Sequence, residues 1–214
     1  MRLMTVLKFG VFISFGLSLI LLTAQVLHAL SFGRRRLLSR PAGNPGKGII
    51  YAFGQGMLPW EKESAARHLP TYVAGILYHA GIFAAILTVL APAAGVKSPP
   101  AAIPFLQVMM AAGFLAGAGL LFKRAVKPQM RYISCPDDFV ANILVDIFLL
   151  AGLMASWHAA ILLAFYIVAT VTFLYLPLGK IRHCFFFFYS RLLFGSYFGR
   201  RGVLPPGGRL GFRG

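Results

Sequence analysis

The stretch PTYVAGILYHAGIFAAILTVL, residues 70–90, decides the fold of this chain. It contains no aspartate, glutamate, lysine or arginine, and its single histidine is His79. An apolar segment of about 20 residues is long enough, as a helix, to cross the roughly 30 Å hydrocarbon layer of a bilayer. We therefore predict a transmembrane helix over residues 70–90.

The remainder of the chain repeats this pattern. Of its 214 residues 58% are hydrophobic, and the mean hydropathy is +0.76, whereas a soluble domain needs a more polar surface. The predicted fold is an all-α integral membrane protein, a five-transmembrane-helix bundle over residues 1–193 followed by a basic, Gly- and Pro-rich tail over 194–214. The four further spans are expected at residues 5–30, 103–122, 139–156 and 159–188.

The 21 basic and 5 acidic residues give a net charge of +16, and their placement predicts the orientation. Eighteen basic residues fall in the segments 31–69, 123–131 and 180–213. Only Arg2, Lys8 and Lys97 fall on the other side. Cytoplasmic loops carry the excess of Lys and Arg, so we expect the N-terminus outside and the C-terminus in the cytoplasm, in the inner membrane of a prokaryote. The charge then reflects topology and anionic headgroups, not nucleic acid.

Two long segments lie outside the predicted spans, the loop over residues 31–69 and the tail after Leu193. Prolines and glycines at the start of the cytoplasmic loop 31–69 argue against a continuous helix there, and the tail after Leu193 is expected to be irregular or ordered only by a partner. Cys135 and Cys184 both fall in predicted cytoplasmic segments, where thiols stay reduced. No CxxC or CxxCH motif occurs, so covalent attachment of a c-type haem is not indicated.

Two histidines are the best candidates for chemistry. His79 lies in a span, where a histidine is costly unless it has a partner, and Gly75 and Gly81 beside it would let a flat macrocycle approach the helix. His183 lies six residues after Pro177 in the fifth span. Both are expected toward the cytoplasmic side, so they could hold one haem iron from its two faces. The alternatives are a hydrogen-bonded interior histidine for His79 and an interfacial one for His183.

The other titratable residues in or near the spans have weaker claims. Asp146 is the one acid well inside a span, which makes it a candidate for proton or quinone chemistry or for structural pairing between helices. His68, three turns before His79, and His28, at the end of the first span, could contribute to a quinone or propionate site, or form a second haem site. His158 lies in the outer link and is expected to be solvated or to hydrogen-bond a quinone.

The two histidines lie in two short motifs, LYHAGI at residues 77–82 and LPLGKIRH at residues 176–183. These motifs resemble the gamma-subunit family of respiratory nitrate reductase, which also includes membrane subunits of sulfite-reduction complexes and of heterodisulfide reductase. The resemblance extends to the span order and orientation of the whole chain. It implies that His79 and His183 ligate a haem b. The family's second haem has no match, because Val89 and Phe165 occupy the corresponding positions, so one haem is expected.

The resemblance further implies the function of a membrane subunit in a respiratory redox complex. Such a subunit relays electrons between menaquinone or ubiquinone and a cytoplasmic iron–sulfur subunit, with other membrane subunits possible. Arg182, next to His183, could neutralise a haem propionate. Two alternatives remain open, a haem-free membrane anchor for a redox complex and a transport subunit that uses Asp146. Whether the chain is itself an enzyme is left undecided.

Overall fold

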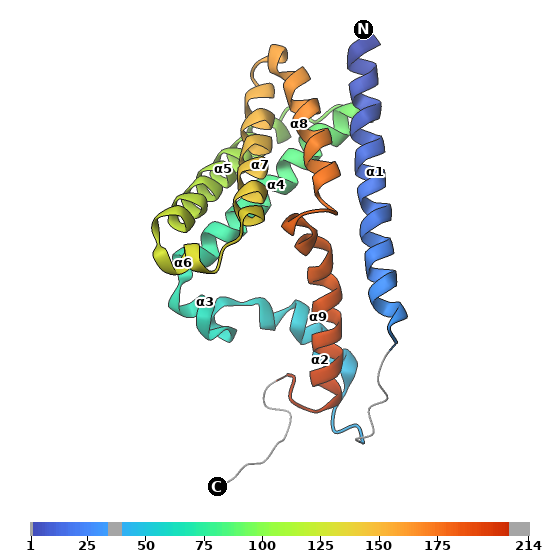
Figure 1. Ribbon diagram of the computed structural model, residues 1–214, viewed down its shortest axis with the longest axis vertical. Helices are drawn as coiled ribbons and strands as arrows, with labels where there is room; N and C mark the ends of the chain where they lie inside the picture. The colour runs from blue at the N-terminus through green and yellow to red at the C-terminus, as the bar shows by residue number, and fades with distance from the viewer. Residues whose placement is uncertain (1, 34–39, 206–214) are drawn as a thin grey trace. The chain divides into compact units, whose positions relative to one another are not determined.

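The computed structural model describes residues 2–33 and 40–205, and these are helical with no β-strand among them (Figure 1). The long helices are α1 (Arg2–Ser31), α4 (Leu69–Ala93), α5 (Ala102–Val126), α7 (Pro136–Ala155), α8 (Leu162–Tyr175) and α9 (His183–Arg200). The short ones are α2 (Pro45–Phe53), α3 (Glu63–Arg67), α6 (Pro128–Tyr132) and the 3-10 turns η1 (Gln55–Met57), η2 (Pro59–Glu61), η3 (Ala159–Ile161) and η4 (Lys180–Arg182). The Arg34–Arg36 cluster and the tail from 206 onward lie outside the described residues.

Four helices, α1, α4, α5 and α7, are each long and apolar enough to cross a membrane. A fifth candidate is a broken pair made of Ala159–Tyr175 and Lys180–Arg200. These features confirm the predicted class, an all-helical multi-pass membrane protein with four or five spans.

The fifth span was expected over residues 159–188, continuing past Pro177, and the structure divides this segment into two helices. Helix α8 ends at Tyr175, and α9 begins at His183. Pro177 explains the break, because proline has no N–H to donate and its ring clashes with the preceding turn. The ring of Tyr175 then packs directly against Gly179, at a place where an added Cβ would collide with it.

The chain divides into two compact units, and the first comprises residues 2–21 and 70–182. Its core consists of side chains from the start of α1 and from α4, α5, α7 and α8, among them Val89, Met110, Leu149 and Phe165. Helices α4 and α5 cross where Gly81 meets Gly113, and neither position has room for a Cβ. Gly113 on α5 therefore lets the two helices approach closely.

Among the described residues, the second unit comprises 22–33, 40–69 and 183–205. Asn44 caps α2 by accepting hydrogen bonds from the N–H groups of Gly46 and Lys47, and Pro45 occupies the first helical position, which suits proline. Helix α2 packs along α9, where Gly48 lies directly against the backbones of Gly195 and Gly199.

The expected irregular tail after Leu193 is therefore helical as far as Arg200. Gly195 and Gly199 are one turn apart and form a flat strip that α2 can approach. The Gly-rich composition after Leu193 predicts a loop. The segment is nevertheless helical, because its tertiary contact with α2 overrides the weak helix propensity of glycine.

Candidate functional site

His79 projects from the middle of α4, and a hydrogen bond to its own helix orients the ring. Nδ1 lies 2.7 Å from the carbonyl oxygen of Gly75, one turn earlier. A carbonyl can only accept, so Nδ1 is the donor in this contact. Metal-ligating histidines commonly donate their other N–H to a backbone carbonyl in this way.

The helix surface beside His79 has space for a flat ligand. The ring is exposed, and a Cβ added at Gly75 would meet no heavy atom within 4 Å. The expectation for Gly81 was wrong, because Gly81 is buried in the α4–α5 crossing and contributes nothing to this surface. In the first unit, His79 and Gly75 thus lie one turn apart on α4, beside a surface with room for an added group.

The other four histidines are exposed in the structure. His183 is the first residue of α9, and it belongs to the second unit together with His28, in the last turn of α1, and His68. His68 is the C-cap of α3, and α4 begins only at Leu69. It therefore does not continue the helix of His79 as the spacing had suggested. His158 is the N-cap of η3, in the link between α7 and α8.

Asp146 lies inside the first unit with an exposed fraction of 6%. The Asn142 amide donates to Asp146 Oδ2 at 2.9 Å and to the Tyr78 hydroxyl at 3.1 Å. The second carboxylate oxygen, Oδ1, is buried without a hydrogen-bond partner and packs against Gly117. Tyr78 precedes His79, and their rings are 6.4 Å apart, so this polar cluster begins beside the candidate ligand and ends at a buried acid.

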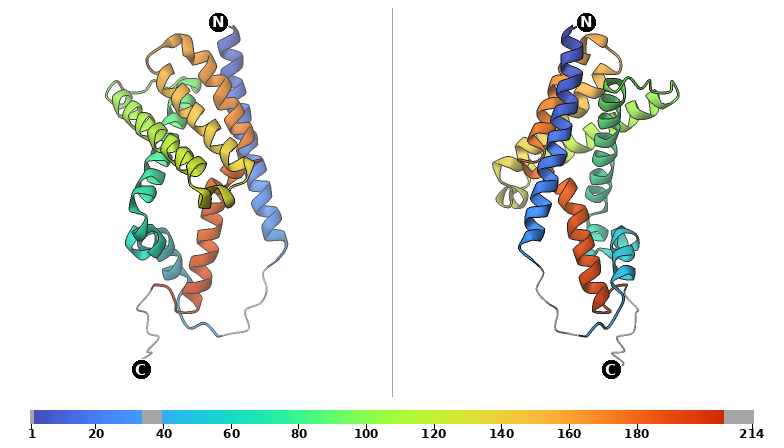
Figure 2. Two further views of the ribbon diagram at one scale, coloured as in Figure 1. Left: turned by 60° about the vertical axis from the view of Figure 1, so that its left-hand side comes forward. Right: turned by 90° about the vertical axis from the view of Figure 1, so that its right-hand side faces the viewer.

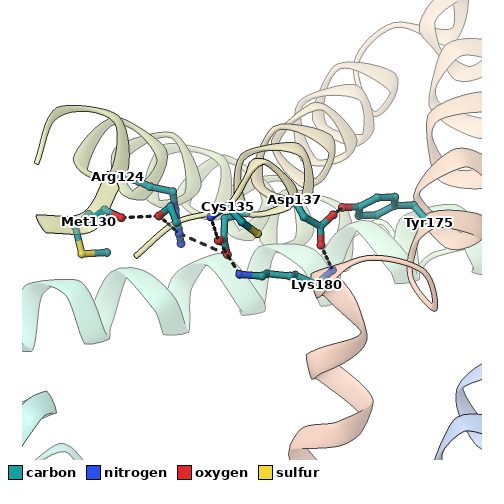
Figure 3. Close-up of polar contacts among 8 residues, drawn as sticks. Arg124, Met130, Cys135, Asp137, Tyr175 and Lys180 are labelled. Atoms are coloured by element: carbon teal, nitrogen blue, oxygen red, sulfur yellow. Dashed lines mark hydrogen bonds and ion pairs between the residues drawn. The ribbon is translucent and has the colours of Figure 1, made fainter. Parts of the chain in front are cut away.

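A second polar network holds the break in the fifth span, and no sequence argument had singled it out. Asp137 accepts hydrogen bonds from the Tyr175 hydroxyl and, at 2.8 Å, from the main-chain N–H of Lys180 (Figure 3). Asp138 pairs with the Lys180 ammonium at 2.7 Å and lies 3.6 Å from Arg124. The available signal was two acids directly after Cys135-Pro136, in the first turn of a helix, where acids are favoured.

Arg182 ends the short turn η4 and is exposed in the first unit. Arg182 comes two residues after Lys180, whose main-chain N–H donates to Asp137. The backbone near Arg182 is therefore held in place, while Arg182 itself is exposed. This arrangement suits a residue that neutralises an anionic group next to His183 along the chain.

Comparison with known proteins adds no relative. No family model, curated protein or solved structure matches this chain. The fold and composition define its class as an all-helical multi-pass membrane protein, and the resemblance to the nitrate reductase gamma-subunit family stays a prediction.

Proposed function

We propose that this chain is a haem b-containing membrane subunit of a respiratory redox complex. In this proposal the N-terminus is outside, the C-terminus is cytoplasmic, and electrons pass between membrane quinone and a cytoplasmic iron–sulfur subunit. The observation that supports it best is the hydrogen bond of His79, whose Nδ1–H donates to the Gly75 carbonyl within its own helix. His183 is the proposed second ligand.

A haem with two imidazole ligands supplies one-electron transfer without an open coordination position. The protein's own residues have separate tasks in the proposal. The Gly75 carbonyl orients the His79 ring and raises its basicity as a ligand. Arg182 offers a guanidinium for an anionic propionate. Asp146 is the proposed proton-exchanging group for quinone, linked to Tyr78 through Asn142.

The test is a pyridine haemochrome assay on protein purified from the membrane, with haem quantified per chain. We expect about one haem b in the wild type, none in His79→Ala or His183→Ala, and the wild-type amount in the control His158→Ala. Gly75→Leu should also lose haem while its helix content is unchanged, because a side chain there fills an open surface.

Three outcomes would contradict the proposal in different ways. A haem-free wild-type protein would favour the membrane anchor. Equal loss of haem in the His158→Ala control would mean that the histidines act through folding. About two haems per chain would assign a ligand role to His28, His68 or His158 and would refute the single-haem prediction.

Transport is the second candidate function, and one observation favours it. Discontinuous transmembrane helices commonly surround a substrate or ion site, and the fifth span is broken between Tyr175 and Lys180. In this case haem would be absent, and proton or cation uptake into proteoliposomes would be abolished by Asp146→Asn.

A further inference from the structure

A cavity of about 540 Å³ lies in the first unit, away from the His79 surface and the Asp137–Asp138 network. Its lining comes from the start of α1, the α4–α5 connection, and the ends of α7 and α8 that meet at their link. These segments gather at the end of the first unit near the N-terminus of α1 (Figure 2). Its volume is within the range of about 300–1,000 Å³ that is usual for ligand sites.

The cavity wall has a charged part and an apolar part. Lys8 and Lys97 both line it, and no aspartate or glutamate does. Val96 and Ile103, with exposed fractions of 58% and 40%, give the wall its accessible apolar part. The cavity therefore combines two positive charges with an apolar lining. An anionic amphiphile is complementary to such a lining.

The backbone of the α4–α5 connection positions one of these charges. Helix α4 ends in a Schellman motif, in which Val96 N–H bonds to Ala91 O at 2.9 Å and Gly95 N–H bonds to Pro92 O at 3.1 Å. Gly95 adopts a φ of +78°, which favours glycine. This turn directs the chain toward Lys97, so the cation stands on a defined loop.

Two of the neutral polar side chains on the wall, Gln107 and Ser156, are hydrogen-bonded to each other. Gln107 donates from Nε2 to the Ser156 hydroxyl at 3.0 Å, and that hydroxyl donates to the Leu153 carbonyl at 2.6 Å. The wall charge thus comes from the two lysines alone. It discriminates in favour of an anion over a neutral molecule of the same shape.

We propose that this cavity binds an anionic phospholipid, with the phosphate headgroup at Lys8 and Lys97 and an acyl chain against Val96 and Ile103. Ammonium groups bind phosphate through charge-assisted hydrogen bonds. The apolar wall adds affinity in proportion to the acyl surface that it covers. The proposal rests on the cavity and not on the haem, so it stands or falls independently of the proposed function.

The experiment measures binding to delipidated protein in a neutral detergent, by native mass spectrometry and by the rise in melting temperature. Phosphatidylglycerol is the probe, and phosphatidylcholine with the same acyl chains, inorganic phosphate, and a neutral short-chain quinone are the comparison ligands. A ligand that binds only the folded protein raises its melting temperature as concentration increases. We expect phosphatidylglycerol to give the largest shift.

The variant Lys8→Gln/Lys97→Gln should bind phosphatidylglycerol at least about tenfold more weakly, because both charge-assisted contacts are lost. The control Lys127→Gln/Arg131→Gln removes the same charge from exposed positions that do not line the cavity, and it should bind like the wild type. Circular dichroism checks that both variants are folded.

Each of the opposing outcomes would overturn the proposal. Equal binding of phosphatidylcholine would remove the role of the net charge. Equal weakening in the control would mean that overall charge, not the cavity, attracts the lipid. A shift with phosphate alone would assign the cavity to a free anion, and a shift only with the quinone would assign it to a neutral ring.

Discussion

Replacement of Gly81 by alanine tests the closest helix crossing in the first unit. An added Cβ would lie 2.8 Å from the Gly113 Cα and 2.8 Å from the Met109 carbonyl oxygen. Both are backbone atoms, which cannot rotate away. Each approach is about 0.6 Å short of the 3.4 Å at which ordinary van der Waals contact begins, so α4 and α5 have to separate to accommodate the methyl group.

Overpacking of this kind costs about 1–3 kcal/mol. It is opposed by the gain of about 0.5–1 kcal/mol that alanine brings over glycine in a helix. The contact outweighs the propensity, so Gly81→Ala should be destabilising by up to about 2 kcal/mol. For a domain of this size, each 1 kcal/mol lowers the melting temperature by about 2–4 °C. The loss is measured by circular dichroism at 222 nm in a fixed detergent.

Gly119→Ala is the matched control, because a Cβ at Gly119, on the same pair of helices, would meet nothing within 4 Å. This variant should melt at the wild-type temperature or slightly above it. If Gly81→Ala and Gly119→Ala changed the melting temperature by the same amount and sign, the reasoning from the crossing would be refuted.

Two further predictions concern polar groups outside the apolar core. Asp137→Ala leaves the main-chain N–H at the helix break without its acceptor and should lower the free energy of unfolding by about 1 kcal/mol, with Asp137→Asn intermediate; identical melting curves for all three proteins would contradict this. Hydrogen bonds, the largest from the Gln55 amide, hold the pKa of Glu61 below its usual value. The ionised Glu61 carboxylate therefore stabilises the folded protein above the unfolded-state pKa of 4.5, and this stabilisation is lost as the pH falls through the lower folded-state pKa. The melting temperature of Glu61→Gln should consequently depend less on pH, between pH 7 and pH 3, than that of the wild type.

The spans could be predicted from the sequence because their signal is local. The apolar residues of a segment such as 70–90 are sufficient to predict a transmembrane helix there. Helix α4 contains this segment and extends one residue before it and three residues beyond it. The glycine pair Gly113 and Gly117 was also readable, since small residues one turn apart favour close packing. Their partners, Gly81 on one helix and Asp146 on another, depend on the fold.

The features that sequence reasoning missed are held by contacts distant along the chain. Asp137 and Lys180 are far apart in sequence, and nothing in either neighbourhood indicates that they meet. Likewise, Gly195 and Gly199 look like loop residues until Gly48 is placed against them. Helix propensity and turn composition describe each segment alone, and tertiary packing decides between them.

Helix α4 has one buried face, and His79 lies on a different, exposed face. Gly81, Ala84, Ala85 and Val89 are buried and lie at the spacing of one helical face. His79 does not share that face, and its ring is exposed among the helices that the structure describes. An imidazole on this exposed face is available to a ligand that lies along α4. If His79 holds a haem, His79→Leu should destabilise the purified protein and remove the haem with it; a variant that keeps the haem of the wild type would contradict the assignment.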